Sequence, residues 1–208
     1  MTDWSIILVS GGVESMTLLH REARRASVVP LFVDYGQRAL EAERRTVRNQ
    51  CRILDLEPVE LDLSRVGRRF HGTALMRAHV PLPHRNMVLL SLGFSYGARI
   101  GARRIYLALN RADAHAYASA GTPFLDAFRH MIDILEPDLA LCTPFIELHK
   151  AQVIQIGQSL GLDFARTYSC LLGHARHCGV CPQCCKRRDA FQAAGLAEPE
   201  RFYRRTPG

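Results

Sequence analysis

The fold of this chain is decided by residues 5–15, SIILVSGGVES. Residues 5–9 form an apolar, β-branched run typical of a strand, residues 10–12 form a glycine turn, and residues 14–26 have the pattern of a helix. Glycines at such a turn let the backbone approach an anion, while the helix N-terminus and the serine hydroxyls offer donors to phosphate oxygens. The stretch lacks the Gly-Lys-Ser/Thr ending of a Walker A loop and the Gly-x-Gly-x-x-Gly pattern of a dinucleotide fingerprint. It therefore predicts a phosphate-binding loop of another kind, with an ordinary tight turn and serine cap as the alternative.

Strand and helix patterns alternate along the rest of the chain. Strands are predicted at 27–35, 59–63, 104–109 and 139–143, and helices at 41–54, 86–101, 124–135 and 149–160. This alternation is typical of βαβ units, so we expect a three-layer α/β domain over residues 1–163 with a parallel sheet of about five strands. Segments 65–82 and 110–122 show no clear period and are expected to be loops.

The composition is that of a globular protein. Of 208 residues, 48% are hydrophobic and 23% charged, which excludes a disordered or fibrous chain. No apolar run approaches the roughly 18 residues that span a bilayer, and no basic region precedes the short apolar N-terminal stretch, so we expect a cytoplasmic protein that does not enter a membrane. The net charge is 27 − 20 = +7, and only Lys150 and Lys186 among the cations are lysines. A scattered basic surface explains this charge, with attraction to a polyanion such as RNA as the alternative.

Residues 164–208 are rich in Cys, His and Arg and predict a compact metal-binding extension. An odd total of seven cysteines in a cytosolic protein argues against disulfides. Two successive C-x-x-C spacings, with one more cysteine eight residues upstream, supply four soft ligands that can close a tetrahedron around Zn²⁺. These cysteines are Cys170, Cys178, Cys181 and Cys184. The alternatives are a ligand exchange with His174 or His177, an iron–sulfur cluster, and buried unligated thiols.

Two of the other three cysteines, Cys51 and Cys142, lie in a predicted helix and a predicted strand, and the third, Cys185, follows Cys184 directly. We expect Cys51 and Cys142 to be core residues. A catalytic persulfide cysteine is the alternative.

Several polar residues stand where a nucleotide site would form. Asp34 ends a predicted strand, where open α/β sheets place ligand-binding groups, and is a candidate for Mg²⁺ or a ribose hydroxyl. Arg85 precedes a predicted helix and can bind phosphate bidentately. Lys150 offers a point charge to a pyrophosphate leaving group. A turn aspartate, a surface arginine and a solvated lysine are the corresponding alternatives.

The loop at residues 10–15 resembles the Ser-Gly-Gly-x-Asp-Ser loop of the N-type ATP pyrophosphatases. Residues 32–38 (FVDYGQR) and 80–86 (VPLPHRN) resemble two motifs of one family in that superfamily, the 7-cyano-7-deazaguanine synthases. Thr143-Pro144 followed by Lys150, and then the cysteine tail, come in the order of that family. The resemblance spans nearly the whole chain.

This resemblance implies an ATP-dependent carbon–nitrogen ligase in which a carboxylate attacks the α-phosphate of ATP. Pyrophosphate leaves, ammonia displaces AMP to give an amide, and a second activation dehydrates the amide to a nitrile. The implied cofactors are ATP, Mg²⁺ and Zn²⁺. The implied partners are a small carboxylate or 7-deazapurine-like substrate and an ammonia donor. Nucleic acid is not favoured as a partner, and a homodimer is compatible with the resemblance. The resemblance implies a phosphate-binding loop of Ser10, Gly11, Gly12 and Ser15, and a magnesium or ATP site of Glu14, Asp34 and Asn86. It implies that Arg85 and Lys150 offset developing negative charge. It also implies a structural zinc on the four cysteines above, with Cys185 as a spare.

The chain also departs from the family pattern. Glu14 replaces the aspartate of the loop, and the segment before Val80 is short. The stretch 110–117 lacks the family's acidic elements and supplies Asn110, Asp113 and His115 instead. We therefore expect an acceptor other than 7-carboxy-7-deazaguanine, or poor use of it. A tRNA-modifying or thiolating enzyme and a non-catalytic nucleotide-binding relative acting with a partner protein are the alternative functions.

Overall fold

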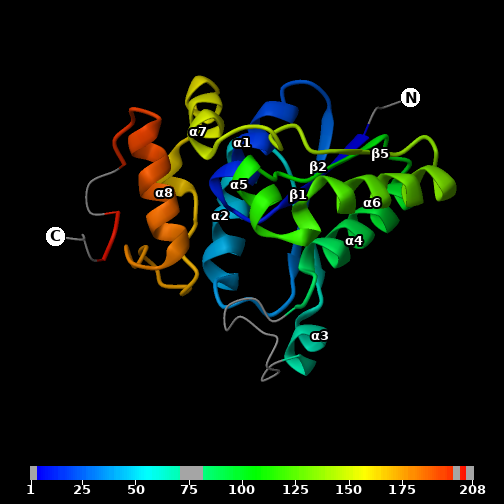
Figure 1. The fold of residues 1–208 in the computed structure, drawn as a ribbon, viewed down its shortest axis with the longest axis horizontal. Helices are drawn as coiled ribbons and strands as arrows, with labels where there is room; N and C mark the ends of the chain where they lie inside the picture. Colours follow the sequence, from blue (N-terminus) through cyan, green and yellow to red (C-terminus); the bar gives the residue numbers. More distant parts are fainter. Residues whose placement is uncertain (1–3, 71–81, 199–201, 205–208) are drawn as a thin grey trace.

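The computed structural model describes residues 4–70, 82–198 and 202–204 and contains a five-stranded parallel sheet. Its strands stand in the order β3-β2-β1-β4-β5 (Figure 1). They are β1 (Trp4–Val9), β2 (Ser27–Asp34), β3 (Val59–Asp62), β4 (Arg104–Tyr106) and β5 (Ala140–Cys142). The predicted parallel α/β fold and its strand count are confirmed.

Helices cover both faces of this sheet. The α-helices of the sheet domain are α1 (Val13–Glu22), α2 (Leu40–Ile53), α3 (Ser64–Arg69), α4 (Arg85–Ile100), α5 (Arg111–Ala116), α6 (Thr122–Leu135) and α7 (Lys150–Ser159). Figure 1 shows α4 and α6 together on one side of the strands and α1, α2 and α7 on the other. The fold therefore has three layers.

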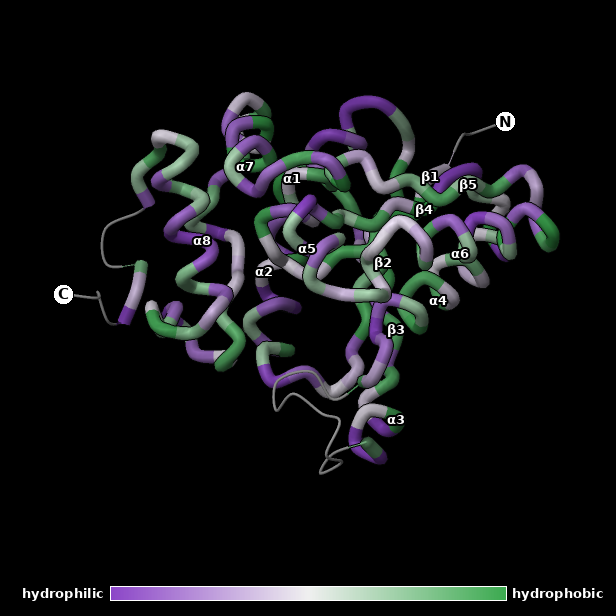
Figure 2. Tube along the Cα trace, in the orientation of Figure 1, coloured by the Kyte–Doolittle hydropathy of each residue, from purple (hydrophilic) through white to green (hydrophobic). Residues whose placement is uncertain are grey.

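The alternation of side chains along β1 explains the two faces. Ile6 and Leu8 join a core cluster with α4 and α6, whereas Ile7 and Val9 join a second cluster with α1, α2 and α7. Successive side chains of a strand point to opposite faces, so an apolar run with helices on both sides is fully buried. Figure 2 shows hydrophobic residues concentrated in these central strands.

Two segments predicted to be loops contain helices. Segment 65–82 begins with α3, and its residues 71–81 lie outside the described part of the chain. Segment 110–122 forms α5 and a 3₁₀ turn, Ala118–Ala120. A capping box starts α5, because the Asn110 side chain accepts hydrogen bonds from two amides of the first turn and Asp113 bonds back to the Asn110 amide. The N-x-x-D pattern was the signal for this helix.

The tail folds against the same domain. After a 3₁₀ turn at Phe164–Arg166, an extended stretch leads to the helix α8 (Pro182–Ala193). Ala190 and Phe191 of α8 pack against Val13 of α1 and Ile154 of α7. Within the described residues, no helix is both long and apolar enough to cross a bilayer.

Candidate functional site

Hydrogen bonds within the loop between β1 and α1 fix its backbone conformation. The Ser15 hydroxyl accepts from the Ser10 amide at 3.2 Å and donates to the Gly12 carbonyl at 3.2 Å. Gly11 has a φ of +75°, and a Cβ there would lie 3.1 Å from the Glu43 carbonyl oxygen and from Thr46. Glycine is therefore required at this position, both for backbone conformation and for space.

Glu14 follows this loop and pairs with Lys150, the first residue of α7. The Lys150 Nζ lies 2.7 Å from the Glu14 Oε1, and these side chains are only 15% and 14% exposed. The Asn110 Nδ2 donates to the same oxygen at 2.9 Å. Burial by itself raises the pKa of Glu14, but the charge of Lys150 and the two hydrogen bonds outweigh it and hold the pKa below its ordinary value. Glu14 is therefore a carboxylate at neutral pH.

A cavity of about 750 Å³ opens beside this pair. The loop contributes Ser10 and Ser15, and α5 contributes Asp113. Burial and the neighbouring Glu14 carboxylate raise the pKa of Asp113. Most of the remaining wall comes from α7 and α8, with Glu14 of α1 and residues of the 108–112 segment completing it. The N-termini of α1 and α7 and the two lysines of the lining, Lys150 and Lys186, are the groups through which this cavity could hold an anionic ligand.

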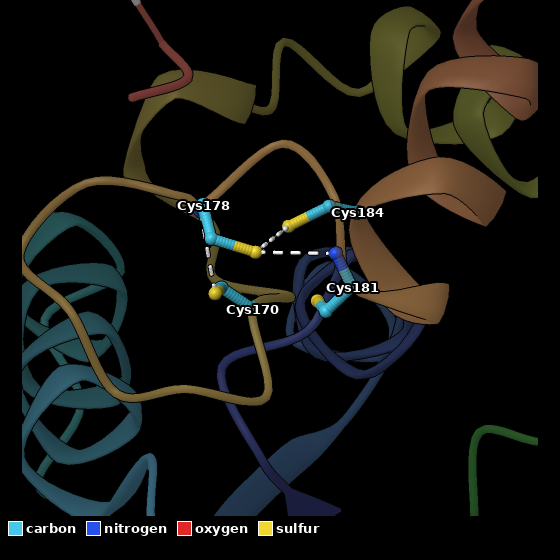
Figure 3. Close-up of side chains that lie close together, drawn as sticks. All are labelled: Cys170, Cys178, Cys181 and Cys184. Carbon is cyan, nitrogen blue, oxygen red and sulfur yellow. Dashed lines mark hydrogen bonds between the residues drawn. The ribbon is translucent and has the colours of Figure 1, made fainter. Parts of the chain in front are cut away.

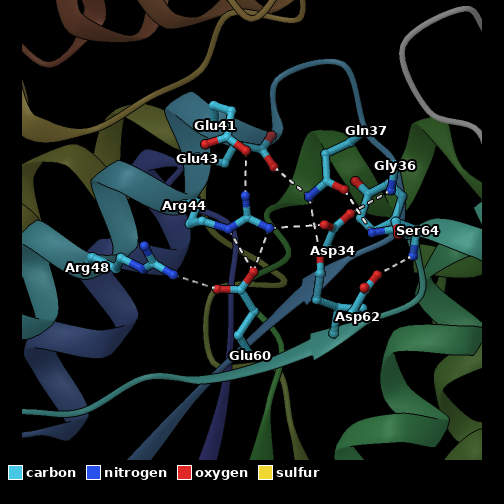
Figure 4. Close-up of polar contacts among 12 residues, drawn as sticks. Asp34, Gly36, Gln37, Glu41, Glu43, Arg44, Arg48, Glu60, Asp62 and Ser64 are labelled. Atoms are coloured by element: carbon cyan, nitrogen blue, oxygen red, sulfur yellow. Dashed lines mark hydrogen bonds and ion pairs between the residues drawn. The ribbon is translucent and has the colours of Figure 1, made fainter.

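A second polar cluster lies at the carboxyl end of β2 (Figure 4). The Asp34 Oδ2 lies 3.0 Å from the Arg44 Nη2, and its Oδ1 accepts from the Gly36 amide at 2.9 Å. Arg44 also bonds Glu60 at 2.6 Å. Asp34, predicted to serve Mg²⁺ or a ribose, thus has an internal partner and does not line the cavity beside Glu14.

Glu43 stands between these two regions. Its backbone carbonyl contacts Gly11 of the loop, and its carboxylate accepts from the Gln37 Nε2 at 3.1 Å. Burial raises the pKa of Glu43 to about 7. The sequence does not single out this carboxyl group, because a helix pattern does not show which residues will contact the polar face of the helix.

Arg85 and Asn86 begin α4 on the Asp34 side of the loop. The Arg85 Nη1 donates to the Tyr35 hydroxyl at 3.2 Å, and its buried Nε has no partner among the described residues. The Asn86 Nδ2 donates to the Ser119 carbonyl at 3.0 Å. Neither residue lines the cavity of Glu14 and Lys150, and their predicted binding roles stay predictions.

The four predicted zinc ligands meet at one point (Figure 3). The sulfur atoms of Cys170, Cys178, Cys181 and Cys184 all lie within 4.8 Å of one another, and all four residues are buried. The Cys178 and Cys184 sulfurs are 3.8 Å apart. A tetrahedral zinc with Zn–S bonds of about 2.3 Å separates its sulfurs by about 3.8 Å, so the arrangement fits that ion.

Backbone amides around the cluster favour thiolates. The Cys178 Sγ accepts from the amides of Val180 at 3.4 Å and Cys181 at 3.2 Å, and the Cys170 Sγ accepts from the Cys178 amide at 3.4 Å. Such N–H···S bonds offset negative charge on sulfur. The His177 Nε2 instead accepts from the Ser169 amide at 2.9 Å, so this histidine is engaged elsewhere.

The remaining cysteines stand apart from the cluster. Burial raises the pKa of Cys51 to about 12 within the core, and burial also raises the pKa of Cys142 on β5. A thiol that stays protonated is a weak nucleophile, which disfavours the persulfide alternative. Cys185 is half-buried, and its sulfur accepts from Arg188.

The tail touches the phosphate loop directly. The Tyr168 amide donates to the Gly11 carbonyl at 2.8 Å, and the Tyr168 hydroxyl donates to the His174 carbonyl at 2.8 Å. Gly173, with a φ of +70°, packs so closely on the chain before α2 that a Cβ would lie 2.3 Å from the Arg38 carbonyl oxygen. The segment that carries the cysteine cluster therefore packs against the phosphate loop and against the chain before α2.

Comparison with known proteins gives concordant results. The model of the family "Queuosine biosynthesis protein QueC" matches residues 4–195. A 7-cyano-7-deazaguanine synthase of Thiobacillus denitrificans is 34% identical, with 98% of this chain and 100% of that protein covered. A 7-cyano-7-deazaguanine synthase 1 of Sulfurisphaera tokodaii is 30% identical, with 95% and 97% covered.

Solved structures share the fold at low sequence identity. NMN synthetase from Francisella tularensis superposes with a TM-score of 0.57 at 14% identity, covering 97% of this chain and 80% of that one. The U34-tRNA thiolase NcsA from Methanococcus maripaludis, solved with its [4Fe-4S] cluster, gives 0.52 at 13% identity, covering 92% and 64%. At these identities the likeness shows the architecture alone.

Proposed function

The chain belongs to the QueC family, and on that premise we propose that it is a 7-cyano-7-deazaguanine synthase that converts 7-carboxy-7-deazaguanine with ATP and ammonia. The observation that carries this function is the extent of the family match, from residue 4 to residue 195. Relatives with this enzyme name are covered over 91% to 100% of their length. The expectation of a different acceptor is therefore wrong, and the changed 110–117 segment is a variation within the same family.

The reaction needs two activations. A carboxylate oxygen attacks the α-phosphorus of ATP, the bond to the bridging oxygen breaks, and pyrophosphate leaves. Ammonia attacks the acyl carbon, loses a proton and displaces AMP, which gives the amide. The amide oxygen then attacks the α-phosphorus of a second ATP and a second pyrophosphate leaves. Departure of AMP with loss of the two amide protons gives the nitrile. Adenylation is required because a carboxylate oxygen is a poor leaving group.

The residues around the cavity supply binding and charge compensation. The Ser10 hydroxyl and the amides at the start of α1 donate to phosphate oxygens, and Lys150 offsets the charge that develops on pyrophosphate. Glu14 holds Lys150 at the cavity wall through the 2.7 Å ion pair. Glu14 and Asp113 are the carboxylates that would hold Mg²⁺, which when bound neutralises phosphate charge. Binding roles for Asp34, Arg85 and Asn86 stay predictions.

We propose that the four clustered cysteines hold one structural zinc ion. Four sulfur ligands leave no open coordination position, so the ion fastens the tail without taking part in the chemistry. The division of the chain at residues 163 and 164, a homodimer and a cytoplasmic location also stay predictions.

Product analysis of the full-length protein tests this function. The protein, with its zinc retained, is incubated with ATP, Mg²⁺, ammonium and 7-carboxy-7-deazaguanine. Mass spectrometry should detect the nitrile, and phosphorus NMR should detect AMP and pyrophosphate, with AMP and nitrile in a two-to-one ratio. Formation of ADP and orthophosphate, or the absence of the nitrile, would overturn the proposal.

A further inference from the structure

Both lysines of this arginine-rich chain line the same cavity. The sequence holds 27 lysines and arginines, of which only Lys150 and Lys186 are lysines. Lys150 begins α7, and Lys186 lies in α8 of the cysteine tail. The two residues are 36 positions apart, yet the packing of α8 against α7 brings both to the cavity of Ser10 and Glu14.

One face of α8 forms this wall. Gln183, Lys186, Ala190 and Ala193 recur at spacings of three and four residues, as one stripe of a helix must, and line the cavity together with the neighbouring Asp189. Arg187 points away from that stripe. It is fully buried and donates to the Glu198 carboxylate at 2.6 Å and to the Thr167 hydroxyl at 2.7 Å. The buried arginine anchors α8, so its exposed neighbour Lys186 is held at the cavity mouth.

The two lysines differ in what they already contact. Lys150 is paired with Glu14, so much of its charge is compensated within the protein. Lys186 is exposed and makes no ion pair within 4 Å in the described part of the chain. It is nevertheless close enough to Asp113 to counteract the raised pKa of that carboxyl group. The positive charge of Lys186 is therefore available to a ligand in the cavity.

We propose that Lys186 binds the β- and γ-phosphates of ATP and the departing pyrophosphate, so that the tail contributes a binding residue to the active site. This inference rests on the proposed function. The phosphates are favoured over the substrate carboxylate because the cavity lining includes the loop hydroxyls of Ser10 and Ser15 and the first residues of α1 and α7, where helix N-termini offer donors to phosphate. An ammonium ion adds a charge-assisted hydrogen bond to that set.

Binding of inorganic pyrophosphate in the presence of Mg²⁺ provides the direct test. Calorimetry on the full-length zinc-loaded protein should show about tenfold weaker binding for Lys186→Met and recovery of most of the affinity for Lys186→Arg. The KM for ATP should rise by a similar factor, while the KM for 7-carboxy-7-deazaguanine stays within about twofold. Arg45→Met removes one charge from an exposed position of α2 and serves as the matched control, with unchanged binding expected.

Unchanged pyrophosphate affinity in Lys186→Met would overturn the inference, and a selective rise in the KM for the deazaguanine would assign Lys186 to the carboxylate instead. If Lys186→Met loses zinc or fails to fold, Gln183→Glu decides, because it places a negative charge on the same face of α8 and must weaken pyrophosphate binding. The binding measurement needs no turnover. A wild-type protein that forms no nitrile would therefore refute the proposed function without deciding the role of Lys186.

Discussion

The cavity beside the phosphate loop and the cysteine cluster are assembled in opposite ways. The cluster takes all four ligands from the 15 residues between Cys170 and Cys184. The cavity takes its charged groups from four helices, with Glu14 on α1 and Lys186 on α8. A metal site built from one short segment can be recognised from spacing, whereas a cavity built from distant segments depends on how the helices pack.

The regions also differ in what their loss should affect. On the proposed function, the cluster stabilises the tail and the residues around the cavity bind ATP. They meet where the Tyr168 amide bonds the Gly11 carbonyl. Substitutions that separate stability, zinc content and activity are therefore the way to test this contrast.

Removal of a zinc ligand should have the largest effect. In Cys181→Ser the ion loses one of four sulfurs, and we expect zinc content to fall well below one per chain with the tail unfolding before the sheet. The stabilisation lost is on the order of 5 kcal/mol, since metal binding and folding are coupled at such sites. Elemental analysis and thermal unfolding measure both quantities. Full zinc retention in this variant would contradict the ligand assignment.

Loss of the Lys150 charge in the cavity should lower the activity without lowering the zinc content. Lys150→Met removes the partner of the largely buried Glu14 carboxylate, so we expect kcat/KM for ATP to fall about 100-fold and the free energy of unfolding at pH 7 to fall by about 2 kcal/mol.

The double variant Glu14→Gln/Lys150→Met should regain most of that stability but not the activity, because no charge is then left unpaired. Steady-state kinetics and denaturant unfolding test both variants. A loss of zinc in Lys150→Met would show that the two regions are not independent.

The Glu43 carboxyl group, which accepts from Gln37 beside the phosphate loop, should make stability depend on pH. Its folded pKa of about 7 is raised above its ordinary value, so its contribution to stability is fully present in acid, below the ordinary pKa of a glutamate, and is lost as the pH rises through 7. After allowance for its partial exposure, the change is about 2 kcal/mol. Glu43→Gln should remove this decline, as unfolding curves between pH 4.5 and 8 would reveal. An equal decline in the variant would assign the effect to another group.

Replacement of the spare cysteine should have the smallest effect. Cys185→Ser lies one residue from a zinc ligand but outside the cluster, and we expect unchanged zinc content and a stability change within about 0.5 kcal/mol. It is the matched control for Cys181→Ser. Zinc loss in both variants would mean that Cys185 is a ligand as well.

The sequence was sufficient for the segments whose structure depends on near neighbours. Apolar runs gave the five strands, the glycine turn gave the phosphate loop, and the pairs of C-x-x-C spacing gave the cysteines that cluster. Segment 110–122 was predicted wrongly as a loop because its apolar periodicity is weak and its helix depends on a capping box. The pairing of Asp34 with Arg44 could not be foreseen, since it needs the position of α2 relative to β2.

The sequence by itself therefore determined the parallel fold, the Ser10–Ser15 loop and the four cysteines that cluster, because the geometry of strands, turns and short loops is fixed over a few residues. The tertiary structure alone decided that Glu14 meets Lys150 and Asn110, that Arg85 bonds the Tyr35 hydroxyl, and that Lys186 reaches the cavity. The two contacts of Glu14 join positions 96 and 136 residues apart. They form only when the helices pack their apolar faces together. A hydrophobic pattern with a period of a few residues does not indicate which polar side chains come into contact as a result.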